Sequence, residues 1–155
     1  MKDTRHEAII RTMHPDDLEQ VIRIEHEIFL FPWSLVNFSD SIKAGYQCRV
    51  LSQAGNDDVM GYGILMMGPD EAHVLTLGIG ASWQKQGWGK YLLGYFIEYA
   101  AAQQVQSVLL DVRESNLGAA TLYKNLGFKQ VGVRKGYYPA MCGREDALVM
   151  VLDLS

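Results

Sequence analysis

A short segment with two glycines, residues 84–90 (QKQGWGK), most strongly constrains how this chain folds. The apolar run before it, residues 72–79, is typical of a β-strand, and the amphipathic run after it, residues 91–102, is typical of a helix. A second apolar strand is predicted at residues 108–112. These elements form a βαβ unit, so the two strands should be parallel and joined by a right-handed crossover.

The glycine segment is typical of a turn that holds a phosphate group. Gly87 and Gly89 allow positive φ angles and a close approach of the backbone to a ligand. The helix that follows offers unpaired N–H groups and the positive end of its dipole, and ligands of open α/β sheets bind at this end of the strands. Two glycines can also serve only a tight connection, so the pair by itself leaves that alternative open.

Periodicity and turn residues predict the other elements. Ser34 follows a proline break and is placed to cap a second helix, and Gly127 is placed to end the last helix. Gly136, Pro139 and Gly143 predict an irregular stretch before the final strand. The predicted strands are residues 8–12, 46–52, 59–66, 72–79, 108–112, 128–133 and 147–154, and the predicted helices start near residues 15, 35, 91 and 117.

Composition excludes several classes of protein. With 155 residues, 48% of them hydrophobic and 21% charged, the chain should form one globular domain, residues 1–155. The polar N-terminus and the lack of a long apolar run predict no signal peptide, no membrane span and a cytoplasmic location. A formal net charge of −4 argues against direct binding of nucleic acid and suits a basic substrate. Cys48, Cys142 and four histidines are scattered, which predicts no metal site.

Several motifs together resemble the GNAT family of N-acetyltransferases. The pattern Gln-x-x-Gly-x-Gly at residues 84–89 is similar to the acetyl-CoA pyrophosphate loop of that family, and residues 111–128 are similar to its strand, catalytic helix and Leu-Gly-Phe turn. The segments at residues 31–34 (FPWS) and 137–147 resemble the members that acetylate the N-terminal alanine of a small-subunit ribosomal protein. The resemblance covers nearly the whole chain. It implies the GNAT acyl-CoA N-acyltransferase fold, an α/β (α+β) fold with a mixed sheet of about seven strands flanked by about four helices.

The resemblance also implies an activity, namely direct transfer of the acetyl group of acetyl-CoA to a protein N-terminus in a ternary complex. Tyr123 would be the general acid for the departing thiolate, although a core tyrosine with a satisfied hydroxyl is the alternative. Asp111 would be the base, at a position where the family pattern usually has a glutamate. Because aspartate is shorter, it would act either directly or through a water molecule. Alternatively, Asp111 pairs with Arg113 for structure alone and Glu114 is the base.

Acetyl-CoA should be held by three groups of atoms. The backbone of Leu77, Gly78 and Ile79 would pair with the pantetheine amides, as an added strand does. Asn116 would bond the cofactor arm, or only cap a helix. The pyrophosphate would lie on Lys85, Gln86, Gly87, Trp88, Gly89 and Lys90.

The acceptor site is less defined by the sequence. Trp33, Arg134, Tyr137 and Tyr138 are interpreted as shaping it, although corner packing and surface charge explain the same residues. Acetylation of a small-molecule amine and an idle acetyl-CoA-binding module remain as alternative functions, and the oligomeric state is left open.

Overall fold

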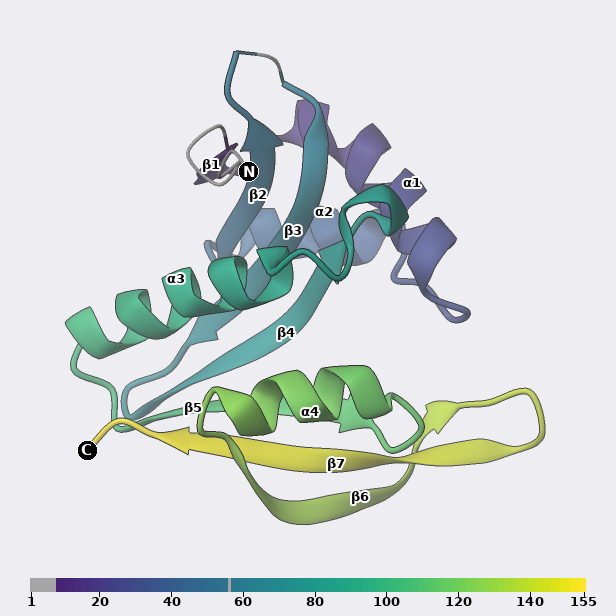
Figure 1. Ribbon diagram of the computed structural model, residues 1–155, viewed down its shortest axis with the longest axis vertical. Helices are drawn as coiled ribbons and strands as arrows, with labels where there is room; N and C mark the ends of the chain where they lie inside the picture. Colours follow the sequence, from purple (N-terminus) through teal and green to yellow (C-terminus); the bar gives the residue numbers. More distant parts are fainter. Residues whose placement is uncertain (1–7, 56) are drawn as a thin grey trace. The chain divides into compact units, whose positions relative to one another are not determined.

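The computed structural model describes residues 8–55 and 57–155 (Figure 1). The N-terminal residues on which the absence of a signal peptide was predicted lie outside the described residues, as does Asn56. The elements in order are β1 (Ala8–Thr12), α1 (Leu18–Ile28), α2 (Leu35–Lys43), β2 (Gln47–Gln53), β3 (Val59–Met67), β4 (Glu71–Ile79), α3 (Trp88–Ala102), β5 (Ser107–Arg113), α4 (Leu117–Asn125), β6 (Lys129–Pro139) and β7 (Arg144–Asp153). Two short 3-10 helices, η2 (Pro15–Asp17) and η3 (Ala81–Trp83), precede α1 and α3.

The strands form one mixed sheet in the order β1-β2-β3-β4-β5-β7-β6. This arrangement, with four α-helices among the described residues, confirms the predicted fold class. The chain divides into two compact units: unit 1 is Met1–Leu65 with Thr76–Tyr95, and unit 2 is Met66–Leu75 with Phe96–Ser155. Strand β4 and helix α3 contribute residues to both units, and each unit is described below by itself. The single domain that composition indicates stays a prediction.

In unit 1, three antiparallel strands carry the core. β1 pairs with β2 from Ala8↔Gln53 to Thr12↔Arg49, and β2 pairs with β3 with a register shift after Leu51. The apolar stripe of α1 is buried as its helical period predicts, and Ser34 caps α2 by accepting a hydrogen bond from the N–H of Asn37. The largest fully buried side chains of these elements are Phe38, Leu51, Met60, Tyr62, Ile64 and Leu65.

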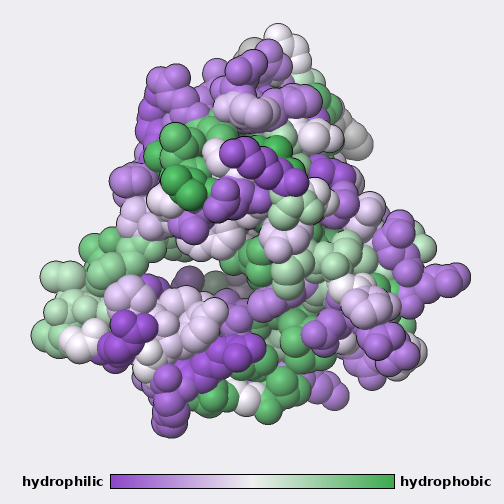
Figure 2. All heavy atoms as spheres, turned by 180° about the vertical axis from the view of Figure 1, so that it is seen from behind, coloured by the Kyte–Doolittle hydropathy of each residue, from purple (hydrophilic) through white to green (hydrophobic). Residues whose placement is uncertain are grey.

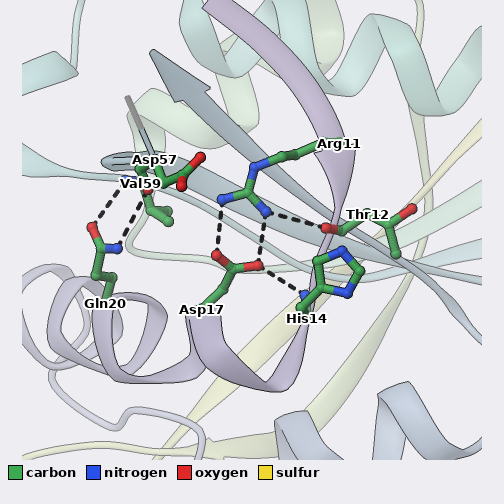
Figure 3. Close-up of polar contacts among 7 residues, drawn as sticks. All are labelled: Arg11, Thr12, His14, Asp17, Gln20, Asp57 and Val59. Carbon is green, nitrogen blue, oxygen red and sulfur yellow. Dashed lines mark hydrogen bonds and ion pairs between the residues drawn. The ribbon is translucent and has the colours of Figure 1, made fainter. Parts of the chain in front are cut away.

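An ion pair connects β1 to the 3-10 helix η2 before α1 (Figure 3). The guanidinium of Arg11 donates two hydrogen bonds to the carboxylate of Asp17, at 2.8 and 2.9 Å, and the same carboxylate accepts the N–H of His14 at 2.8 Å. Nearby, the amide of Gln20 bridges α1 to the backbone at Asp57 and Val59. The hydrogen bond from Arg11 is the main reason that the pKa of Asp17 lies below its ordinary value, against the opposing effect of burial.

Replacing Asp17 with Asn should destabilise the protein by about 1–3 kcal/mol at pH 7, because it removes charge-assisted hydrogen bonds from a buried acceptor. A lowered pKa means that this stabilisation is present above the unfolded-state pKa and is lost as pH falls through the folded-state pKa. The difference between wild type and D17N should therefore shrink between pH 6 and pH 3, as measured by urea unfolding. The exposed neighbour Asp16 supplies the control D16N, and an equal loss in both variants would contradict the prediction.

Unit 2 contains the remaining strands and α4. β4 pairs in parallel with β5 from Glu71↔Ser107 to Val74↔Leu110, as the predicted βαβ unit requires. β7 then lies between β5 and β6 and is antiparallel to both (Figure 1). Asn116 caps α4, and Gly127 follows that helix with a φ of 102°.

The irregular stretch predicted around Gly136 is wrong in part, because β6 continues to Pro139. Its pairing with β7 stabilises the extended backbone there, and a register shift between Arg134 and Tyr138 accommodates Gly136 at a φ of 58°. The sequence prediction failed because it weighed turn residues locally, whereas the pairing partner lies in another strand.

The surface has no single dominant apolar face in the view of Figure 2, where hydrophobic side chains (green) reach the surface in separate clusters among hydrophilic ones (purple). Those that unit 2 exposes are Leu117, Val131, Val133, Tyr137 and Met141. Within the described residues, no helix combines the length and the apolar character needed to cross a bilayer.

Candidate active site

The glycine segment, residues 84–90, follows β4 after the short helix η3, and hydrogen bonds hold the connection between them. The N–H of Gly80 donates to the carbonyl of Met60 at 2.8 Å, and that of Ala81 donates to the carboxylate of Glu27 at 2.9 Å. Gln84 turns back so that its side-chain amide donates to the carbonyl of Ile79 at 2.9 Å. The glutamine of the motif therefore ties the segment to the end of its strand.

The backbone of this segment has two residues in the left-handed region, Lys85 with a φ of 63° and Gly87 with a φ of 90°. Helix α3 begins at Trp88, three residues earlier than Tyr91, where the sequence pattern placed it. Of the two glycines, Gly87 uses this freedom, whereas Gly89 lies in the first turn of α3. A lysine at positive φ is uncommon, and left-handed residues beside a helix start can orient several N–H groups toward one anion.

The side chain of Trp88 packs in the hydrophobic core. It is 2% exposed and belongs to a buried cluster with Ala8, Leu51 and Met60. Its ring also meets that of Tyr91 edge to face, with the centroids 5.7 Å apart. The indole therefore anchors the start of α3, which leaves only the backbone of Trp88 for the predicted contact with pyrophosphate.

The backbone predicted to bind pantetheine contacts a buried polar pair, Tyr62 and Glu25, at Gly78. A Cβ at Gly78 would lie 2.5 Å from the hydroxyl oxygen of Tyr62, so the two groups meet without room for a side chain. That hydroxyl donates to one carboxylate oxygen of Glu25, and the N–H of Trp33 donates to the other at 2.9 Å. Glu25 is only 2% exposed, and this burial raises its pKa.

Trp33 is thus held at the junction of α1 and α2. The centroids of its ring and that of Phe38 are 5.2 Å apart, which is the corner packing that the sequence analysis gave as an alternative. A role of Trp33 in binding the acceptor stays a prediction. Sequence reasoning missed Glu25 as a polar centre, because it assigned the apolar face of α1 to core packing alone. The available signal was a glutamate at a core-facing position of that helix.

In unit 2, Asp111 lies between the imidazole of His73 and the guanidinium of Arg134. Its side chain is 9% exposed, and one carboxylate oxygen accepts the Nε–H of Arg134 at 3.1 Å. The other oxygen is 3.3 Å from Nε2 of His73. The hydrogen bond from His73, helped by Arg134, holds the pKa of Asp111 below its ordinary value although burial opposes the shift.

Arg113 is engaged on the same strand. It donates to Glu145 at 3.0 Å and to the carbonyl of Pro139 at 2.7 Å, and its guanidinium lies 4.5 Å from the ring centroid of Tyr138. Glu145 also accepts the N–H of Ser115 at 2.8 Å, so it links β7 to the turn before α4. The recorded ion-pair partners of Asp111 are therefore His73 and Arg134, rather than the Arg113 that the structural alternative named.

Two tyrosines accompany Asp111 in unit 2. Tyr123 lies on α4 with its ring 6.0 Å from that of Phe128, and burial raises its pKa to about 12. Burial, with a further contribution from the charge of Asp111, raises the pKa of Tyr138 to about 12. Both phenols are therefore protonated at neutral pH and can donate hydrogen bonds or protons.

The remaining predicted residues have identifiable structural contacts. Oδ1 of Asn116 accepts the N–H of Ala119 at 3.2 Å, which is the helix cap; its contact with a cofactor stays a prediction. Tyr137 is 49% exposed, and the guanidinium of Arg134 lies 5.6 Å from its ring centroid. Unit 2 thus brings together Asp111, Arg134, Tyr137 and Tyr138, while Leu77–Ile79, the glycine segment and Trp33 belong to unit 1. Among the described residues, no cluster of three His, Cys, Asp or Glu side chains is arranged to hold a metal ion.

Comparison with known proteins identifies the class. The model of the acetyltransferase (GNAT) family matches residues 18–128. The chain belongs to this family, and it is an acetyl-CoA-dependent N-acetyltransferase.

Particular relatives match almost end to end. The chain is 34% identical over 146 residues to the [ribosomal protein bS18]-alanine N-acetyltransferase (RimI) of Escherichia coli K12, covering 94% of this chain and 97% of the relative. It is 36% identical to the enzyme of that name from Haemophilus influenzae, over 95% and 99% of the two chains. The crystal structure of the E. coli ribosomal-protein-S18-alanine N-acetyltransferase superposes with a TM-score of 0.88 at 33% identity, covering 96% of this chain and 94% of that one.

Proposed function

We propose that this enzyme transfers the acetyl group of acetyl-CoA to the N-terminal α-amino group of a ribosomal protein that begins with alanine. The observation that carries the proposal is the near-complete match, at 34–36% identity, to enzymes named for that reaction. Unit 2 supports it with a buried carboxylate next to an imidazole, and with two phenols that are protonated at neutral pH. We also propose that the reaction takes place in the cytoplasm.

For the co-substrate, we propose that the backbone of residues 85–90 holds the pyrophosphate. The left-handed residues Lys85 and Gly87 and the first turn of α3 suit an anion, because N–H groups there have no partner within the helix. The backbone of Leu77–Ile79 would pair with pantetheine amides, although the carbonyl of Ile79 already accepts one bond from Gln84. When bound, acetyl-CoA supplies an activated acyl group with a thiolate leaving group.

The proposed chemistry needs a base and an acid. An α-amino group has a pKa of about 7.7–8.0, so it must lose a proton before it attacks the thioester. The negative charge of Asp111 would favour the loss of this proton. Tyr123 would donate a proton to the leaving thiolate, and its raised pKa keeps that proton in place at neutral pH.

The experiment is an acetylation assay with three acceptors: an Ala-initiated peptide from the N-terminus of bS18, the same peptide with its α-amine blocked, and a panel of polyamines. We expect thiol release and a single acetyl group on the free peptide only. Turnover on polyamines alone would favour the small-amine function. Binding of acetyl-CoA without turnover on any acceptor would favour an idle binding module.

A further inference from the structure

We propose that His73 is the group that accepts the proton of the acceptor amine, and that Asp111 is a positioning residue which orients His73 and stabilises its charged form. The inference rests on the proposed function and specifies which atom does the basic step. His73 was not singled out by any motif, since the four histidines are scattered in the sequence. Its importance depends on the neighbours that the fold gives it.

The geometry makes His73 and Asp111 a pair. His73 lies on β4, where it is registered with Leu109 of the parallel strand β5, and its Nε2 reaches the Asp111 carboxylate at 3.3 Å. The second carboxylate oxygen is occupied by Arg134. Both oxygens of Asp111 therefore already have donors, whereas the imidazole of His73, at 26% exposure, keeps a side open to solvent.

The contact also selects a tautomer. Because Nε2 faces a carboxylate, which only accepts, the neutral imidazole should carry its proton on Nε2 and its lone pair on Nδ1. This proton is assigned from the hydrogen-bond partner. Nδ1 is then the basic atom, and a charge formed on the ring lies next to the carboxylate of Asp111.

The basicities favour the imidazole over the carboxylate. His73 and Arg134 hold the pKa of Asp111 below its ordinary value, so this carboxylate is a weak base toward an α-ammonium group. An imidazole ordinarily has a pKa of about 6.5, which is much closer to the pKa of the amine and to neutral pH. The charged and titratable groups recorded around the pair are Arg134 and Tyr138 of β6, in addition to the pair itself.

The N–H bond of the α-ammonium breaks and its proton moves to Nδ1 of His73, giving an imidazolium beside the Asp111 carboxylate. The free amine forms a C–N bond with the thioester carbonyl, and the C–S bond breaks. The thiolate takes the proton of Tyr123, which regains one from the attacking nitrogen, and the imidazolium later releases its proton to water.

The test compares His73→Gln and Asp111→Asn with wild type, using the Ala-initiated peptide across pH 5.5–9.5. We expect H73Q to lower kcat by about 10²–10⁴-fold at pH 7 and to remove the rise of kcat with pH. D111N should have a smaller effect and move that rise to lower pH, because it removes the charge that stabilises the imidazolium. Acetyl-CoA binding should be unchanged in both variants, and His26→Gln, an exposed site on α1, is the control.

A second measurement does not depend on activity or on the folding of H73Q. NMR titration of the imidazole resonances should show the His73 midpoint at a lower pH in D111N than in wild type. Wild-type activity with an unaltered pH profile in H73Q, or an unmoved midpoint, would overturn the inference and leave the proposed function standing. A wild-type enzyme that is inactive on the peptide would instead overturn the proposed function.

Discussion

Replacing Tyr123 with Phe should lower kcat of acetyl transfer by about 10²–10⁴-fold at neutral pH, because the variant cannot protonate the leaving thiolate. Burial raises the pKa of Tyr123 to about 12, so the wild-type phenol is fully protonated at pH 7 and available as an acid. The ring and its contact with Phe128 are kept in Y123F, so stability and acetyl-CoA binding should change little. The measurement is thiol release under saturating peptide, together with calorimetric binding of acetyl-CoA.

The matched control for Y123F is Tyr99→Phe, which removes a hydroxyl from a partly buried tyrosine on α3 of the same unit. We expect Y99F to retain its activity. Full activity in Y123F would remove Tyr123 from the acid role and would favour the alternative of a core tyrosine. An equal loss in both variants would point to general destabilisation, which thermal unfolding would detect.

Replacing Glu25 with Ala should lower the free energy of unfolding by about 2–4 kcal/mol, because it leaves one buried and one half-buried donor without an acceptor. These donors are the hydroxyl of Tyr62 and the N–H of Trp33. For a chain of this size, the midpoint of thermal unfolding should fall by roughly 5–15 °C. Since Tyr62 also meets the backbone of Gly78, E25A should weaken acetyl-CoA binding as well.

The pH dependence of this loss has a defined sign. Burial raises the pKa of Glu25, so the folded state binds more protons than the unfolded state between the two pKa values. The contribution of Glu25 to stability is thus fully present below the unfolded-state pKa and declines as pH rises through the folded-state pKa. The stability gap between wild type and E25A should therefore be larger at pH 4 than at pH 8.

The control for E25A is Glu19→Ala on the same helix. The side chain of Glu19 is 86% exposed and pairs with the exposed Arg23 at 3.4 Å, so its removal should cost less than about 0.5 kcal/mol. Equal destabilisation by E19A and E25A in urea unfolding would contradict a special role for the buried pair.

Local patterns in the sequence determined most of the fold. The apolar periods, the cap at Ser34 and the glycine at 127 predicted the helices and strands, because these signals act within a few residues. The parallel βαβ unit followed from strand, loop and helix order, and the glycine motif indicated the family that the comparisons confirm. Those inferences needed no knowledge of long-range contacts.

The tertiary structure alone decided which groups meet in the site. Arg134 is 23 residues from Asp111, and Tyr62 is 37 residues from Glu25, so neither pair leaves a local signal. Strand register placed His73 beside Asp111, core packing buried the ring of Trp88, and pairing with β7 extended β6 through Gly136. The sequence determined the elements and the family, whereas the partners, burial and basicity of each side chain depend on packing between elements distant in the chain.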